Sequence, residues 1–136
     1  MKRLLGLDYG DVRIGIALSD PLKIFSKPYT VLANNEKLFP KLKKLIKQKN
    51  IEKIIVGLPL NLSGKDSSKT KEVRQFARKL SNYIDIPLTF WDERFSSEEA
   101  NSILEKMGYS YMDSKKLVDK VAAHLILKNY MENKVK

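Results

Sequence analysis

Three carboxylates in this sequence lie directly after an apolar segment or within one. Asp8 ends the apolar run of residues 4–7, and Glu93, with Asp92 beside it, follows the apolar run of residues 86–90 in the segment WDERFSS. Asp119 comes late in the chain, within the segment VDKVAAHLIL. If the fold brings the three together, they can do chemistry that one exposed carboxylate cannot.

Helical spacing indicates which residues lie on the same face as Asp119. Residues three, four and seven positions further along a helix lie on the same face, and here they are Ala122, Ala123 and Ile126. So small and apolar a face lets a helix approach a sheet closely, which would bring Asp119 down onto the sheet. A buried carboxylate needs a cation or hydrogen bonds. Two lysines of the same helix offer a salt bridge as the structural alternative, Lys115 and Lys116.

The chain contains no cysteine and one histidine, His124, which is expected to be a packed helix residue rather than a base. Carboxylates suit hard divalent cations, so the expected cofactor is Mg²⁺ or Mn²⁺, held by Asp8, Glu93 and Asp119 as catalytic ligands. Two such ions, roughly 3.5 to 4 Å apart, can activate water and stabilise the leaving oxygen of a phosphodiester. Structural alternatives stay open, with Asp8 as a turn cap and Glu93 as a partner of Arg94.

A formal net charge of +10 points to a polyanionic partner. A lysine-rich composition can also serve solubility alone, and charge by itself does not decide between the two. No apolar run approaches the roughly 18 to 20 residues that span a bilayer, and Asp8 interrupts the apolar start of the chain, so neither a membrane span nor a signal peptide is expected. We therefore expect a cytoplasmic protein that forms one domain over residues 1–136.

Hydrophobic periodicity predicts an α/β fold. Extended segments are expected at residues 2–8, 13–19, 25–32, 51–58 and 87–91. Helices are expected at residues 36–48, after the loop of residues 61–67, at residues 96–107 and after a capping Asp113. The first helix has an apolar stripe of Leu38, Leu42, Leu45 and Ile46, and the second has one of Val73, Phe76, Ala77 and Leu80. Pro28 suits an edge strand, and the β-branched run at 51–58 suits a buried parallel strand. The order β-β-β-α-β-α-β-α-α predicts a mixed five-stranded sheet flanked by helices, in which an antiparallel meander joins parallel strands through right-handed crossovers.

Several polar residues are expected to contact nucleic acid, among them Arg13, Asn61 and Lys65. The loop of residues 61–67 precedes a helix, and its exposed amides, with Asn61 and Lys65, could hold a phosphate near the start of that helix. An ordinary connecting loop is the alternative. Lysines between residues 37 and 53 could track a phosphate backbone, or they could form a solvated helix face.

Four segments in a fixed order resemble a known family. LLGLDYGDVRIGIALSD, VGLPLNLSGKDS, DERFSS and VDKVAAHLIL are similar to segments of the YqgF/RuvX family, Holliday-junction-resolvase-like proteins described as pre-16S rRNA nucleases with an RNase H-like fold. The resemblance runs from about residue 3 to residue 130. It implies that the family's three acids are Asp8, Glu93 and Asp119. The family's loop glycines are matched by Gly10 and Gly57. Its DER arginine is matched by Arg94, and the resemblance implies that Arg94 contacts nucleic acid by orienting a phosphate, or holds Glu93. Members more often read DERLTT, and the serines here cap a helix as threonine does.

The resemblance implies a nuclease that trims the 5′ end of the ribosomal RNA precursor, with ribosomal particles as further partners. Cleavage of branched DNA is one alternative; such resolvases act as symmetric dimers, and the sequence leaves the oligomeric state open. A nucleic-acid-binding factor without catalysis is another. The last is phosphoryl transfer from ATP, because the D-x-G hairpin with RIGIA resembles the phosphate hairpin of actin-like kinases, although those folds use two such domains around the nucleotide.

Overall fold

The structure is a computed structural model that describes residues 2–59, 67–92 and 111–134, with the backbone alone for residues 111–118 and 134. These ranges contain eight elements: β1 (Arg3–Asp8), β2 (Arg13–Ser19), β3 (Ser26–Ala33), α1 (Leu38–Lys49), β4 (Ile51–Leu58), α2 (Ser68–Tyr83), β5 (Leu88–Asp92) and α4 (Tyr111–Lys134). The helix predicted at residues 96–107 lies outside the described residues. No helix within these ranges has the length and apolar character that crossing a membrane requires.

The five strands form one mixed sheet in the order β3-β2-β1-β4-β5. β1, β2 and β3 pair antiparallel, whereas β4 and β5 continue from β1 in parallel. The predicted meander joined to parallel strands is therefore confirmed. Pro28 lies in β3, at an edge of the sheet, where a residue without an N–H group can sit facing solvent.

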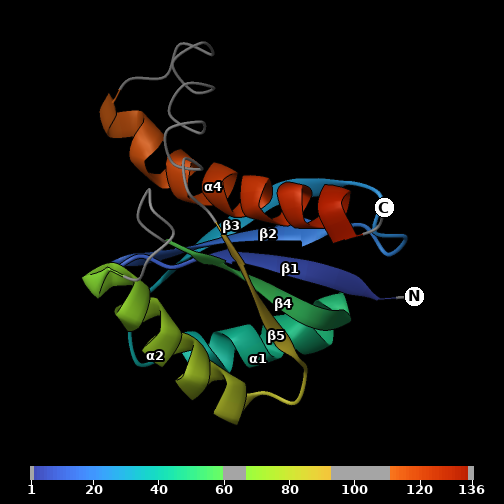
Figure 1. Cartoon of the computed structure of the whole chain (residues 1–136), viewed down its shortest axis with the longest axis horizontal. Helices are drawn as coiled ribbons and strands as arrows, with labels where there is room; N and C mark the ends of the chain where they lie inside the picture. The colour runs from blue at the N-terminus through green and yellow to red at the C-terminus, as the bar shows by residue number, and fades with distance from the viewer. Residues whose placement is uncertain (1, 60–66, 93–110, 135–136) are drawn as a thin grey trace.

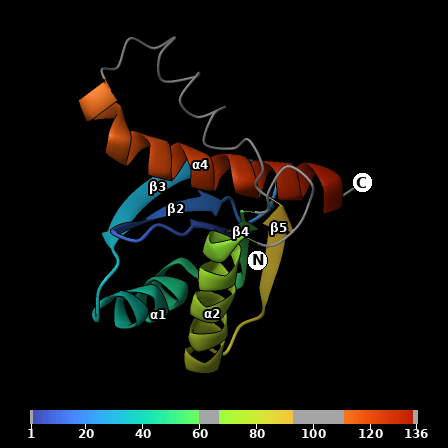
Figure 2. The ribbon, with the colours of Figure 1, turned by 60° about the vertical axis from the view of Figure 1, so that its left-hand side comes forward.

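Helices cover both faces of the sheet. Figures 1 and 2 show α4 across one face and α1 and α2 together against the other. β1, β4 and β5 run parallel and end together at what we call the carboxyl end of the sheet, marked by Asp8, Leu58 and Asp92. Open α/β sheets usually carry their functional sites outside the carboxyl ends of their strands.

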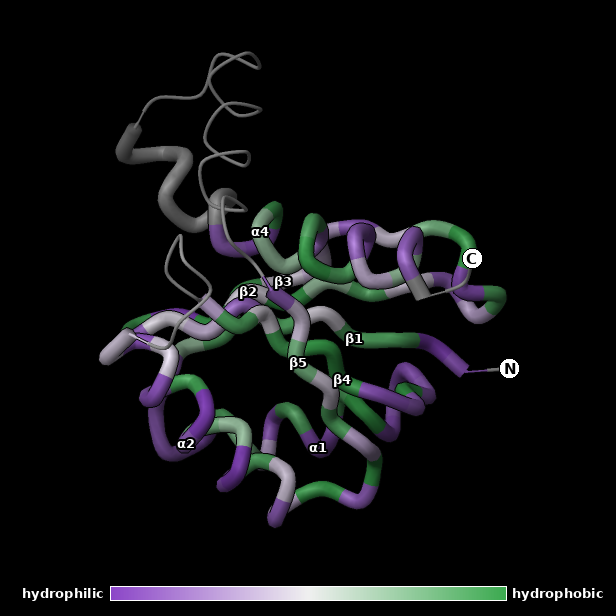
Figure 3. The backbone as a smooth tube through the Cα atoms, viewed as in Figure 1, coloured by the Kyte–Doolittle hydropathy of each residue, from purple (hydrophilic) through white to green (hydrophobic). Residues whose placement is uncertain are grey.

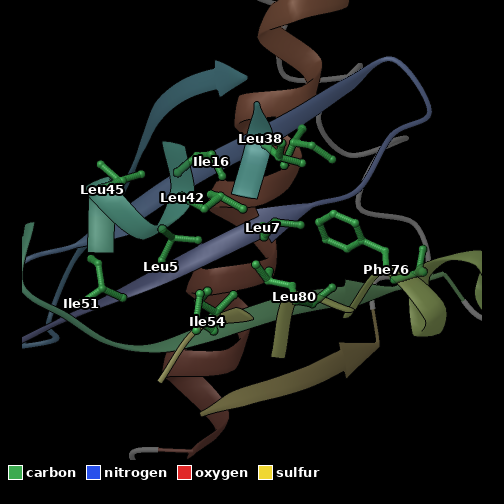
Figure 4. Close-up of a cluster of buried hydrophobic side chains, with 14 of the residues drawn as sticks. Leu5, Leu7, Ile16, Leu38, Leu42, Leu45, Ile51, Ile54, Phe76 and Leu80 are labelled. Carbon is green, nitrogen blue, oxygen red and sulfur yellow. The ribbon is translucent and has the colours of Figure 1, made fainter. Parts of the chain in front are cut away.

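The larger core lies between the sheet and the helices α1 and α2. Leu5 and Leu7 of β1 pack there with Leu42 of α1 and Leu80 of α2, and all four side chains are fully buried (Figure 4). Figure 3 shows the corresponding division, with mainly hydrophobic β1 and β4 inside and many hydrophilic positions along α2. The apolar stripe predicted for α1 is confirmed, because its buried residues are Leu38, Leu42 and Leu45.

A second core lies between the sheet and α4. Ala123, Ile126 and Leu127 are fully buried and pack with Leu4 of β1. A Cβ atom added at Gly6 would come 2.7 Å from the carbonyl oxygen of Ala123 and 2.8 Å from the Cβ of Leu127. Glycine in the strand and alanine in the helix therefore bring the two backbones into direct contact, as the small face of the helix predicted.

Two predicted helix boundaries were wrong. α1 begins at Leu38 rather than at residue 36, because the backbone oxygen of Asn35 accepts from the Leu38 N–H and its side chain accepts from the Lys37 N–H, which closes a turn before the helix. α4 is already helical at Tyr111, so Asp113 is not its N-cap. An aspartate in the first turn complements the helix dipole much as a capping aspartate does, and sequence separates the two positions poorly.

Candidate metal and nucleic-acid site

Asp8 is the last residue of β1, the central strand, at the carboxyl end of the sheet. In the antiparallel register it lies opposite Gly15 of β2. Successive side chains along a strand point to opposite faces. Because Leu4 and Gly6 face α4, the half-buried side chain of Asp8 faces α4 as well.

Asp119 reaches the same place from α4. A Cβ atom added at Gly15 would overlap the carbonyl oxygen of Asp119 and lie 3.2 Å from its Cα, so the helix rests directly on Gly15. Residues opposed on antiparallel strands have Cβ atoms roughly 4.5 to 5.5 Å apart. The Cβ of Asp8 therefore lies within about 9 Å of the Asp119 Cα. Two predicted site residues from opposite ends of the chain thus share one face of the sheet.

Among the side chains that the structure describes, Arg13, the first residue of β2, forms an ion pair with Asp119. The Nε atom of Arg13 donates a hydrogen bond to Oδ2 of Asp119 at 2.8 Å. The two side chains are 31% and 23% exposed, so water screens the pair and its net contribution to stability is small, about 1 kcal/mol or less. The structure places Arg13, which was expected to contact nucleic acid, on the face of the sheet that carries Asp8 and Asp119, which we call the acidic face.

Asp92 lies at the same end of the sheet but faces the other side. Trp91 packs into the core under α4, with its ring centroid 5.7 Å from that of Tyr130. Phe90 lies on the α2 side, where the Arg74 guanidinium is 5.6 Å from its ring centroid. The alternation of side chains therefore turns Asp92 toward α2, away from the face that carries Asp8.

Four predicted site residues lie outside the described residues: Asn61, Lys65, Glu93 and Arg94. Within residues 2–59, 67–92 and 111–134, no three acidic or histidine side chains come together as a metal-binding group. Asp8 and Asp119 nevertheless offer only oxygen ligands, and the guanidinium of Arg13 shows that a positive charge is stabilised beside Asp119. This donor set fits a hard cation such as Mg²⁺ or Mn²⁺.

Lys69, in the first turn of α2, adds positive charge beside the β1–β2 hairpin. Its ammonium group forms ion pairs with Asp11 at 2.7 Å and Glu72 at 3.3 Å, and lies 5.1 Å from the ring centroid of Tyr9. Partial burial lowers the pKa of Lys69, but the hydrogen bonds to the two carboxylates outweigh it, so the pKa is raised. The same contact with Lys69 lowers the pKa of Asp11. Lys69 is therefore charged throughout the neutral pH range.

His124 packs against β3 and takes no part in the acidic face. Its Nδ1 atom lies 2.8 Å from the hydroxyl of Ser26. Ser26 pairs with Ser19, at the end of β2 remote from Gly15. Burial lowers the pKa of His124, and the nearby Lys128 lowers it further. The expectation that His124 is a packed helix residue is confirmed.

Sequence reasoning did not single out two residues that shape this site. A lone glycine within a strand signals the close approach of another backbone, which is the role of Gly15 beneath Asp119. Tyr9 was not singled out either. Its ring packs 4.7 Å from that of Phe76, on the opposite side of the sheet from Asp8, and no local pattern in the sequence signals that contact.

The sheet order, with three antiparallel strands followed by two parallel ones and an acidic residue at the end of the central strand, defines an RNase H-like domain. Solved structures of resolvases share this fold, among them the following two. One is T. thermophilus RuvC in complex with Holliday junction substrate, with a TM-score of 0.58 and 11% identity, covering 97% of this chain and 96% of that chain. The other is the Fowlpox virus resolvase with substrate Holliday junction DNA, with a TM-score of 0.57 and 12% identity, covering 98% and 99%.

The chain belongs to the RuvX family, described as Holliday junction resolvase, which it matches over residues 2–133. A relative from Koribacter versatilis named "Putative pre-16S rRNA nuclease" is 42% identical over 134 residues, covering 97% of this chain and 88% of that protein. A relative of the same name from Syntrophomonas wolfei is 40% identical over 132 residues, covering 96% of this chain and 94% of that protein. The resemblance carried by the four segments is therefore confirmed.

Proposed function

We propose that this protein is a divalent-metal-dependent nuclease that processes the 5′ end of pre-16S rRNA during ribosome biogenesis in the cytoplasm. The observation that carries the proposal is the meeting of Asp8 and Asp119 on one face of the sheet, at Gly15. The printed name of the relatives supports the RNA substrate. The net charge of +10 supports a polyanion of either kind.

Asp8, Asp119 and Glu93 would hold the metal ions, Mg²⁺ or Mn²⁺. Once bound, such ions activate a water molecule and stabilise the leaving oxygen of the phosphodiester. Glu93 rather than Asp92 is the third ligand in this proposal, because Asp92 faces α2 and cannot join Asp8 without reversing the alternation of β5. The sheet and α4 provide the rigid support that a precise site needs.

Arg13 would have two positions. In the structure its guanidinium neutralises Asp119. An arginine fork binds carboxylate and phosphate with similar geometry, so Arg13 can exchange Asp119 for a phosphate oxygen of the substrate held at this face. Its predicted contact with nucleic acid and its ion pair with Asp119 are then two states of one side chain. Asn61, Lys65 and Arg94 would add contacts to the phosphate backbone.

Cleavage of a 5′-extended 16S rRNA precursor, compared with a four-way DNA junction of equal nucleotide content, tests the proposal. The RNA should be cut in Mg²⁺ or Mn²⁺, and cutting should stop in EDTA and in Asp8→Asn. Asp92→Asn is the matched control, since it removes one charge at the same end of the sheet from the other face, and it should cut normally.

The outcomes separate the alternatives. Junction cleavage without RNA cleavage would show that the protein is a branched-DNA resolvase that acts through the same carboxylates, and not an RNA nuclease. Metal-independent binding without cleavage of either substrate, including precursor within ribosomal particles, would favour a binding factor. Full activity of Asp8→Asn would remove the assignment of the site.

A further inference from the structure

A surface cavity of about 570 Å³ lies between α1 and α2, on the face of the sheet opposite α4. Four aromatic residues contribute to its lining: Tyr9, Phe39, Phe76 and Tyr83. Tyr83 is 40% exposed and Phe39 is half-buried, so their rings are accessible from the cavity. The proposed nuclease chemistry makes no use of this cavity.

The cavity adjoins the acidic face, because Tyr9, which lines the cavity, directly follows Asp8 in the chain. Asp8 turns toward α4, and the next residue, Tyr9, turns toward α2, where its ring centroid is 4.7 Å from that of Phe76. The backbone at residues 8 and 9 therefore forms a rim with a carboxylate on one side and an aromatic ring on the other. A nucleic-acid strand held at Asp8 needs only to pass this rim for a base a few nucleotides away to reach the cavity.

The polar groups of the cavity suit a neutral ring with a hydrogen-bonding edge. Asn34, Asn35 and Gln75 line it with amides, and amides can both donate to and accept from base edges. Glu36 and Glu72 also line it, and their negative charge opposes entry of a phosphate. The cavity therefore favours a base over the backbone that carries it.

Lysines lie beside two of the aromatic rings. The Lys43 ammonium lies 5.1 Å from the ring centroid of Tyr83, and that of Lys69 lies 5.1 Å from the centroid of Tyr9. Lys79 lines the cavity itself. Aromatic rings for stacking with lysines beside them for phosphates are the combination by which proteins hold single strands.

We propose that this cavity binds an unpaired nucleobase of the substrate strand, in single-stranded RNA next to the scissile phosphate. The proposal rests on the proposed nuclease function for the placement of the strand at Asp8. Recognition of single-stranded RNA commonly takes this form, with splayed bases stacked on aromatic side chains and hydrogen-bonded along their edges. The enzyme would thereby select precursors whose extension is single-stranded near the cleavage point.

Fluorescence of 2-aminopurine tests the cavity without relying on cleavage. The base analogue is placed at successive positions of a short single-stranded RNA that matches the precursor extension, and binding is measured to Asp8→Asn protein in Mg²⁺. Stacking on an aromatic ring quenches this fluorophore, so quenching should be confined to one or two adjacent positions. Tyr83→Ala should abolish that quenching and weaken binding by about fivefold or more, and Tyr83→Phe should retain both.

The chain offers a matched control. Tyr29 is 38% exposed and has Lys49 at 5.4 Å from its ring centroid, much as Tyr83 is 40% exposed with Lys43 at 5.1 Å. Tyr29 is not among the residues that line this cavity. Tyr29→Ala should therefore change neither the quenching nor the affinity by more than about twofold.

Uniform quenching along the strand, or equal effects of Tyr83→Ala and Tyr29→Ala, would overturn the base-binding cavity. Those results leave metal-dependent cleavage intact, so they are distinguishable from failure of the nuclease proposal. Position-specific quenching that depends on Tyr83, in a protein whose wild-type form never cleaves, would support the cavity while removing the nuclease.

Discussion

Asp119 of α4 lies so close to Gly15 of β2 that no other residue type fits at position 15 without displacing the helix. The overlap involves the carbonyl oxygen of Asp119 rather than a side chain that could rotate away. Since Gly15 also lies opposite Asp8, a single glycine sets the separation of two carboxylates. The geometry of the acidic face therefore depends on backbone packing as much as on the acids themselves.

Gly15→Ala should destabilise the fold and impair the site together. Overpacking a well-packed position typically lowers the free energy of unfolding by about 1 to 3 kcal/mol. Because the added methyl group would clash with backbone atoms, we expect a loss of about 3 kcal/mol or more. Gly6→Ala is the graded comparison, because its added Cβ would meet Ala123 and Leu127 at 2.7 and 2.8 Å rather than overlapping. Urea denaturation should rank wild type above Gly6→Ala and Gly6→Ala above Gly15→Ala. A Gly15→Ala protein of wild-type stability would contradict the close contact.

Arg13 and Asp119 should show a modest coupling free energy in metal-free buffer. Arg13→Gln, Asp119→Asn and the double variant form a thermodynamic cycle measured by denaturation. Because both side chains are partly exposed, we expect a coupling of about 0.5 to 1 kcal/mol that shrinks in high salt. Additive effects of the two substitutions would show that the pair makes no contribution.

His124 should make stability fall as the pH is lowered. Its pKa is lowered from 6.5 in the folded state by burial and by Lys128, so the unfolded chain takes up the proton more readily. Stability should decrease as the pH falls through 6.5 and level off below the folded pKa.

His124→Gln should remove the step below pH 6.5, since the chain has no other histidine. Glu52 and Asp20 also have lowered pKa values, but their usual values of 4.5 and 3.8 place the stability they lose at more acidic pH. Denaturation curves of the wild type and His124→Gln across the two ranges check this, and an unchanged acid profile in His124→Gln would contradict it.

RNA binding should weaken steeply with salt. Each phosphate neutralised contributes roughly 0.7 to 0.9 to the slope of log K against log salt concentration. Lys43 lies beside the ring of Tyr83, so Lys43→Ala should make the slope shallower by about one such increment. Lys27→Ala, at an exposed position of β3, is the control and should leave the slope unchanged, as filter binding over a salt series can show. Equal slopes for both variants and the wild type would contradict a phosphate contact at Lys43.

Much of the fold follows from local patterns in the sequence. Alternating and continuous apolar runs predicted the strands, and the spacing of Leu38, Leu42 and Leu45 predicted the buried face of α1. The small side chains on the helix face around Ala123 predicted that α4 packs closely on the sheet. These features are predictable because each depends on residues within one element, where the periods of helix and strand apply.

Contacts between distant segments could not be predicted in the same way. Arg13 and Asp119 are 106 residues apart, and the sequence offered only the nearby Lys115 and Lys116 as partners of Asp119. The aromatic cavity draws Tyr9, Phe39 and Phe76 from three separate segments. The face of Asp92 depends on the register of β5, which local composition does not determine.

The affinity of the protein for Mn²⁺ tests the central claim most directly, namely that Asp8 and Asp119 are ligands on one face of the sheet. Calorimetric or electron-paramagnetic titrations would compare the wild type with Asp8→Asn, Asp119→Asn and Asp92→Asn. We predict that the first two variants lose affinity by at least about tenfold to a hundredfold, because even outer-shell partners of a metal contribute that much, and that Asp92→Asn binds like the wild type. Undiminished affinity in Asp8→Asn, or an equal loss in Asp92→Asn, would contradict the account.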